Sequence, residues 1–207
     1  MMKEQPETPD LGEDLLAPWE EEAGASSRLG MLLFLASLTV FFGASIVGYL
    51  IIRLDSPLAP PPGHLVLPSG LWVSTLLLLL TGWAIHMADR RARHRASGSL
   101  RWWLSLGLGS GLAFVAVQAP CLLELLRVHR VALAQQGGAI YGLTFALVVI
   151  HALHVLGGMV PLAALTFDAW RRTAGTVSRQ RMWGCALYWH FLEVVWIALF
   201  GVFQITA

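Results

Sequence analysis

Four ionisable side chains lie inside long apolar stretches of this 207-residue chain. His151 and His154 occur in the run "FALVVIHALHVLGG", and His190 and Glu193 occur in "YWHFLEVVWIALF". The two members of each pair are three residues apart, so on a helix they lie on the same face. Histidine and carboxylate groups at such positions bind metals, carry protons or form buried hydrogen bonds. The residue types therefore allow three kinds of chemistry.

The stretches that carry these residues have the length of membrane-spanning helices. Hydrophobic residues make up 56% of the chain and charged residues only 13%, which is not the balance of a soluble domain. A helix needs about 20 apolar residues to cross the hydrocarbon core of a bilayer. The sequence therefore predicts an all-α polytopic membrane protein, a bundle of five transmembrane helices. The expected spans are about residues 29–52, 71–89, 102–124, 138–167 and 182–205.

Residues 1–28 differ in composition from the rest of the chain. They contain eight of the thirteen acidic residues, three prolines and few apolar anchors. Such a segment buries little apolar surface, so we interpret it as an acidic tail that is disordered outside the membrane. Residues 29–207 then form the five-helix membrane domain.

The distribution of basic residues predicts the orientation of the bundle. With five spans, eleven of the fourteen Lys and Arg residues fall on the side of the N-terminus, and only Arg53, Arg127 and Arg130 fall on the other side. Because basic residues accumulate on the cytoplasmic side, we expect a cytoplasmic N-terminus and a C-terminus outside. The basic loop "DRRARHRASGSLR" is expected to meet anionic lipid headgroups, and no nucleic-acid partner is expected.

Three interpretations of the deep polar residues stay open at this stage. A metal or haem site is one, although di-metal bundles use several glutamates in Glu-x-x-His spacing, and only one deep glutamate is present here. A proton path is the second, and a hydrogen-bonded network that fixes helix packing is the third. An unpaired carboxylate inside a bilayer is costly, so we expect His154 or His190 to hydrogen-bond Glu193. His86, three residues before Asp89, is expected to lie too near its span end to join them.

The two polar runs together resemble subunit III of the haem–copper terminal oxidases. That family shows a His-x-x-His-Val run ending in glycines, and later Tyr-Trp-His-Phe, an acidic residue and Val-Val-Trp. The run "LGMLLFLASLTVFFGA" is similar to the first helix that the family shares, and the resemblance extends over about residues 29–205. It indicates the short five-helix bacterial type. The matching residues are His151, His154, Val155, Gly157, Gly158, Tyr188, Trp189, His190, Phe191, Glu193, Val194, Val195 and Trp196.

The resemblance implies a non-catalytic accessory subunit of a cytochrome c oxidase-type enzyme complex in a bacterial inner membrane, with the C-terminus in the periplasm. The complex would reduce oxygen to water and translocate protons. Subunits I and II would be the partners and would hold the haem and copper, while this chain would bind phospholipid and carry no cofactor, metal or catalytic residue. The implied buried polar network is His151, His154, His190 and Glu193. The implied lipid or interface contacts are Tyr188, Trp189, Trp196, Arg171 and Arg172.

The chain also departs from the family pattern. The family usually has a buried glutamate after a serine in its first shared helix, but here Leu38 follows Ser37. An effect on proton pumping that depends on that glutamate is therefore not expected. An accessory subunit of a nitric oxide reductase is an alternative, and a stand-alone carrier or a metal or haem enzyme is an alternative of a different class. Whether the electron donor is cytochrome c or a quinol does not follow from these residues.

Overall fold

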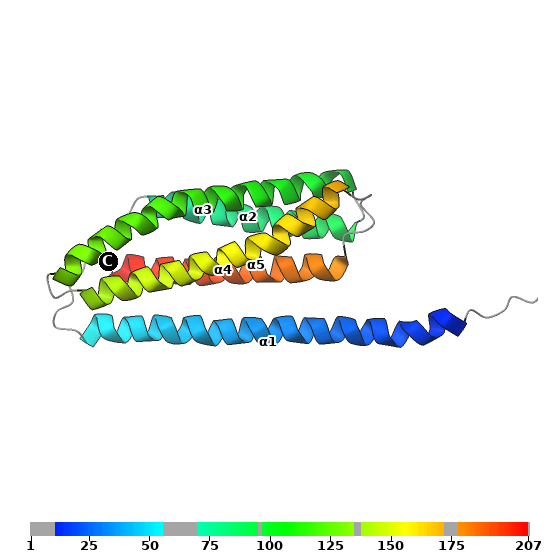
Figure 1. The fold of residues 1–207 in the computed structure, drawn as a ribbon, viewed down its shortest axis with the longest axis horizontal. Helices are drawn as coiled ribbons and strands as arrows, with labels where there is room; N and C mark the ends of the chain where they lie inside the picture. Colours follow the sequence, from blue (N-terminus) through cyan, green and yellow to red (C-terminus); the bar gives the residue numbers. More distant parts are fainter. Residues whose placement is uncertain (1–10, 56–69, 95–96, 135–137, 172–177, 207) are drawn as a thin grey trace, which may run out of the picture.

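The computed structural model describes residues 11–55, 70–94, 97–134, 138–171 and 178–206. Within these ranges the chain forms helices and contains no strand (Figure 1). Each helix includes a stretch that is long and apolar enough to cross a membrane, which confirms the predicted fold class. The helices are α1 (Leu11–Asp55), α2 (Gly70–Arg93), α3 (Ser97–Ala134), α4 (Gly138–Arg171) and α5 (Arg179–Thr206).

Helix α1 begins well before the expected start of the first span. It starts at Leu11, so residues 11–28, which we expected to be disordered, are helical; residues 1–10 lie outside the described residues. The stretch is rich in leucine, alanine and glutamate, which are strong helix formers. Figure 1 shows this part of α1 continuing beyond the ends of the other helices.

The other four helices form a closed arrangement, and α1 lies outside it. Helix α2 packs against α3 and α5, and α4 packs against the same two helices. Among the described residues α1 contacts only α4 and α5, and Figure 1 shows it along one side of the bundle. Its outer face is apolar and exposed, with Val40 at 71%, as suits a helix that faces lipid.

Glycines bring the helices of the bundle close together. A Cβ atom added at Gly111 of α3 would lie 2.7 Å from Met159 Sδ of α4. One added at Gly158 of α4 would lie 2.8 Å from Tyr188 Cε1 of α5. Small residues let membrane helices approach closely, and at these two positions a larger side chain would clash with the neighbouring helix.

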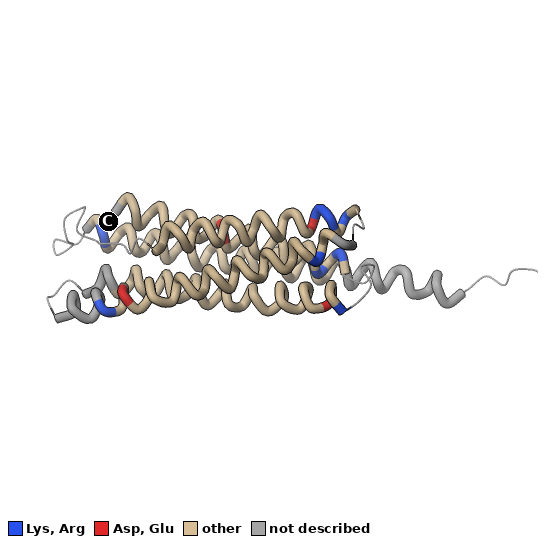
Figure 2. Tube along the Cα trace, turned by 90° about the horizontal axis from the view of Figure 1, so that it is seen from above, with Lys and Arg blue, Asp and Glu red and all other residues tan. Residues whose placement is uncertain are grey.

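Most of the described basic residues gather at one end of the bundle, which we call the arginine-rich end (Figure 2). Helices α2 and α4 end there with arginines in their last turns, and α5 begins there. Arg28 lies over the Trp183 ring at 5.8 Å, and Arg101 lies over the Trp170 ring at 5.3 Å. Tryptophan and arginine together are typical of a membrane–water interface, so this end marks one boundary of the spans.

Candidate functional site

His190 and Glu193 form a hydrogen-bonded pair on one turn of α5. The His190 Nδ1 atom lies 2.8 Å from Glu193 Oε2, so the ring N–H donates to the carboxylate. The carboxylate side chain is 12% exposed and the imidazole is 42% exposed. The expected hydrogen bond between a histidine and Glu193 is therefore present, and it pairs the glutamate without a group from another helix.

The Glu193 carboxylate lies directly against Gly82 of α2. A Cβ atom at position 82 would occupy the space of the Glu193 carboxylate group. Because glycine has no side chain, the carboxylate fits into the contact between α2 and α5. Glu193 is thus positioned by its own helix through His190 and by the neighbouring helix through Gly82.

His86 joins this pair, contrary to our expectation. The centroids of the His86 and His190 rings are 5.8 Å apart. We had placed His86 too near the span end because the charged residues begin at Asp89. Helix α2 instead continues to Arg93, so His86 lies about two turns inside its end. The antiparallel helix α5 brings His190 to the same level.

His151 lies in the core of the bundle. It is 0% exposed, and neither ring nitrogen has a hydrogen-bond partner among the described residues. Its ring stacks on the Trp196 indole with a centroid distance of 5.0 Å and an angle of 27°. The ring of Phe42 approaches from α1 at 6.3 Å. His151 therefore serves as an aromatic packing residue between α1, α4 and α5.

His154 faces α1 and is satisfied within its own helix. Its Nδ1–H donates to the Ile150 carbonyl oxygen at 2.7 Å, and its ring meets Phe42 at 5.4 Å. Glu193, in contrast, lies against α2. No hydrogen bond in the described part of the chain joins His151 or His154 to the His190–Glu193 pair. The four residues therefore occupy separate contacts rather than one network.

Three aromatic residues of α5 hold the neighbouring helices. Tyr188 Oη donates to the His154 carbonyl oxygen at 2.9 Å, and Trp189 Nε1 donates to the Gly158 carbonyl oxygen at 3.3 Å. Trp196 Nε1 donates to Thr75 Oγ1 of α2 at 2.9 Å.

We had expected these aromatic residues to contact lipid or a partner. Trp189 and Trp196 are 0% and 1% exposed, so this expectation is wrong for both tryptophans. Their indole groups point into the bundle because their N–H donors find acceptors there. Arg171 is exposed at the end of α4 with its guanidinium over the Phe167 ring at 4.6 Å. Arg172 lies outside the described residues.

Sequence reasoning missed the small polar residues that connect α2 to its neighbours. Thr75 accepts the Trp196 hydrogen bond, and the hydroxyl groups of Thr81 and Ser110 lie 2.9 Å apart between α2 and α3. Serine and threonine in membrane helices usually bond back to their own helix, as Thr81 also does to the Leu77 carbonyl. Their types alone therefore do not indicate a contact between helices.

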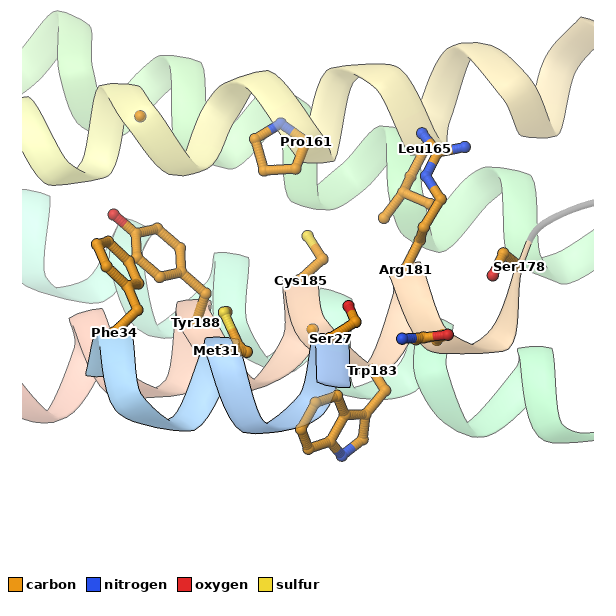
Figure 3. Close-up of a pocket in the computed structure, with 14 residues that line it drawn as sticks. Ser27, Met31, Phe34, Pro161, Leu165, Ser178, Arg181, Trp183, Cys185 and Tyr188 are labelled. Atoms are coloured by element: carbon orange, nitrogen blue, oxygen red, sulfur yellow. The ribbon is translucent and has the colours of Figure 1, made fainter. Parts of the chain in front are cut away.

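A cavity of about 860 Å³ opens between α1, α4 and α5 near the arginine-rich end (Figure 3). Met31, Phe34, Leu165 and Tyr188 give it an apolar lining, and Arg181 lies at its edge. A smaller hollow of about 350 Å³ lies at the same end, between side chains of α1, α2 and α5. That hollow is lined by Arg28, Asp89, Arg93, Arg179 and Trp183.

The candidate metal ligands do not converge. In the described part of the chain no group of three or more His, Cys, Asp or Glu side chains is arranged to hold a metal ion. Cys121 and Cys185 are both buried free thiols, and they belong to different helices. The deep polar residues are instead engaged in contacts within and between helices.

Fold and site together define a class: a polytopic helical membrane protein whose deep polar residues position helices. No protein-family model matches the chain. It is 30% identical over 187 residues to cytochrome c oxidase subunit 3 of Thermostichus vulcanus, with 86% of each chain covered. It is 24% identical over 179 residues to the Bacillus subtilis cytochrome c oxidase subunit 3, again with 86% of each chain covered.

A quinol oxidase protein is similarly related. The chain is 25% identical over 181 residues to cytochrome bo(3) ubiquinol oxidase subunit 3 of Pseudomonas aeruginosa, with 87% of this chain and 85% of the relative covered. The chain belongs to the subunit III family of haem–copper oxidases and is an accessory subunit of such a complex.

Proposed function

We propose that this chain is a non-catalytic subunit that supports oxygen reduction to water and proton translocation by a bacterial haem–copper oxidase. The observation that supports this most is the similarity to oxidase subunit 3 proteins over 86% of both chains. Subunits I and II are the proposed partners and hold the haem and copper. The proposed location is the bacterial inner membrane, with the arginine-rich end in the cytoplasm.

The deep side chains of this chain contact one another and the neighbouring helices, which supports a non-catalytic role for the chain. His190 pairs with Glu193, His154 donates to its own helix, and His151 is enclosed by aromatic rings. The span of α1 contains no acidic residue. Leu38 occupies the position where the family usually has glutamate. Proton transfer through α1 is therefore not part of the proposal.

The electron donor is proposed to be selected by the partner subunits. Relatives of this chain are named both as cytochrome c oxidase subunits and as ubiquinol oxidase subunits at 24–30% identity. Since both kinds of relative match the chain over similar lengths, the shared fold suits either donor.

Phospholipid binding is a second proposed property. The cavity between α1, α4 and α5 has an apolar lining for acyl chains, and Arg181, whose guanidinium pairs with Asp168 at 2.8 Å, also lines it (Figure 3). Arg28 and Arg179 line the neighbouring hollow at the same end. Basic residues at the membrane boundary attract anionic headgroups. We propose that a phospholipid lies with its headgroup at the arginine-rich end.

Purification of the tagged chain from its own membranes tests the proposal. We expect a haem-bearing partner to co-purify in equal amount, oxygen consumption by the complex, and phospholipid in the extract. Consumption of nitric oxide instead of oxygen would favour a nitric oxide reductase complex. A haem Soret band or about one copper or iron per chain in protein free of partners would overturn the accessory role. Purification without any haem-bearing partner would overturn it as well.

A further inference from the structure

The outer edge where α2 meets α5 has a mixed chemical character. We call it the α2–α5 seam and define it by six residues. Trp72, Leu79 and His86 are spaced by seven along α2, so they share one face. His190, Val194 and Ile197 share one face of α5. Ring contacts of Trp72 with Phe200 at 4.8 Å and of His86 with His190 at 5.8 Å show that the two edges adjoin.

The apolar members of the seam are open to the surroundings. Trp72 is 59% exposed, Leu79 41%, Val194 65% and Ile197 50%. Taken alone, such residues suit lipid as well as another protein. The outer faces of α1 and α4 have the same apolar character, with Val40 at 71% and Val160 at 70% exposure. The apolar residues therefore do not identify what covers the seam.

The imidazoles of the seam distinguish it from those faces. His86 is exposed, and the His190 side chain is 42% exposed. His190 lies nine residues from Arg181 and His86 lies four residues from Arg90, or roughly 14 Å and 6 Å along the helix axes at 1.5 Å per residue. Acyl chains offer no hydrogen-bond partner to either ring, and polar side chains in spans face protein or a water-filled cavity.

One ring nitrogen of His190 is engaged and the other is not. Its Nδ1–H donates to Glu193, which leaves Nε2 available to hydrogen-bond a neighbour. The His86 ring finds no hydrogen-bond partner among the described residues. A neighbour that supplies a hydrogen-bonding group at the level of His86 and His190, with apolar groups beside Val194 and Ile197, would complete the seam.

We infer that the α2–α5 seam is the face that docks onto transmembrane helices of the haem-bearing subunit, with a hydrogen-bonding side chain of that subunit at His86 and His190. The inference rests on the proposed function, because it names the face by which this chain would join the complex. The acyl chains of a lipid offer no hydrogen-bond partner to the two imidazoles. A water-soluble protein does not reach it, because His86 and His190 lie inside the spans.

Site-specific photocrosslinking in the assembled complex tests the inference. A photoreactive benzoylphenylalanine replaces Leu79 or Val194 on the seam, and Leu153 or Val160 on the outer face of α4 as matched controls; the controls are 60% and 70% exposed. We expect both seam positions to crosslink to the haem-bearing subunit and both α4 positions to give no such product. Crosslinks to that subunit from α4 alone would overturn the inference, as would seam products with lipid or a second copy only.

The histidines are tested by their effect on subunit retention. His86→Leu and His190→Leu are compared with Leu153→Ala in the complex during stepwise increase of detergent. We expect the histidine variants to lose the haem-bearing subunit at a several-fold lower detergent concentration, while the control retains it like the unmodified chain. If all three variants retained the haem-bearing subunit equally, this inference would be overturned and the proposed function would still stand. If the unmodified chain retains no haem-bearing partner, the proposed function fails with it.

Discussion

The Glu193 carboxylate fills the volume that a side chain at position 82 would need. The carboxylate is fixed by His190 on its own helix, so it does not swing away freely to admit a new atom. Among the described glycines, Gly82 is the one at which an added Cβ atom would lie closest to another atom, and alanine is the smallest residue that adds one. Gly109 of α3 is a natural comparison, because a Cβ atom there would meet nothing within 4 Å.

We expect Gly82→Ala to destabilise the bundle, because overpacking a well-filled helix contact costs about 1–3 kcal/mol. Gly109→Ala is the control, and it should leave stability unchanged or raise it slightly, since alanine is favoured over glycine in a helix. Thermal unfolding of the purified complex measures both. Introduced into a Glu193→Ala variant, Gly82→Ala should cost much less than it does in the unmodified chain, since the clash with the carboxylate is removed. Equal unfolding temperatures for the two single glycine variants would contradict this account.

The His190–Glu193 hydrogen bond predicts a graded response to substitution at position 193. Glu193→Gln keeps an oxygen that accepts the His190 N–H, so we expect a loss of about 1 kcal/mol or less. Glu193→Leu leaves the half-buried imidazole N–H without that acceptor, and we expect a loss of about 1–3 kcal/mol. Unfolding of the purified complex again provides the measurement. A leucine variant as stable as the glutamine variant would show that the hydrogen bond contributes little.

Local spacing predicted only part of the site. The sequence predicted that His154 or His190 would pair with Glu193, and the partner is His190, whose separation of three places it on the same face of one helix. The contacts of His86, Gly82 and Thr75 depend on how far α2 extends and how it is offset against α5. Those two quantities follow from packing between helices, so the sequence of either helix does not contain them.

At the scale of elements, apolar length predicted the number of spans because each span must satisfy its backbone hydrogen bonds within the bilayer. The same signal did not place the helix ends. Helix α1 begins at Leu11 and α2 ends at Arg93, both beyond the apolar stretch, because helix propensity continues where hydrophobicity stops.

The arrangement of the helices leads to a test of their orientation. We expect Ser97→Cys to lie in the cytoplasm and Ser69→Cys outside, because most of the basic residues lie at the end where α3 begins. Both are introduced into a chain in which Cys121 and Cys185 are replaced by alanine. An impermeant thiol reagent added to intact cells should label only position 69. Labelling of position 97 alone, or of both equally, would reject this orientation.

At the scale of the whole molecule, the described surface within the spans is mainly apolar and the candidate ligands do not converge on a metal site. The proposed function assigns the activity of the complex to the partner subunits. We expect removal of this chain from the purified oxidase to leave the haem absorption spectrum unchanged and to lower turnover or shorten the active lifetime. A changed haem spectrum would indicate that this chain contacts or holds a redox centre. Re-addition of the purified chain should restore turnover and provides the control.

The outlying position of α1 has a consequence for synthesis. Its neighbours α4 and α5 both follow it in the chain, and among the described residues it contacts no other helix. A ribosome therefore delivers α1 to the membrane before either neighbour exists, and α1 has neither of its contacts until translation reaches α4. The apolar character of its span, which contains no acidic residue, is compatible with this interval, since a helix can be stable in a bilayer before it associates. Helix α5, which is made after α4, completes the contacts of α1 within the described bundle.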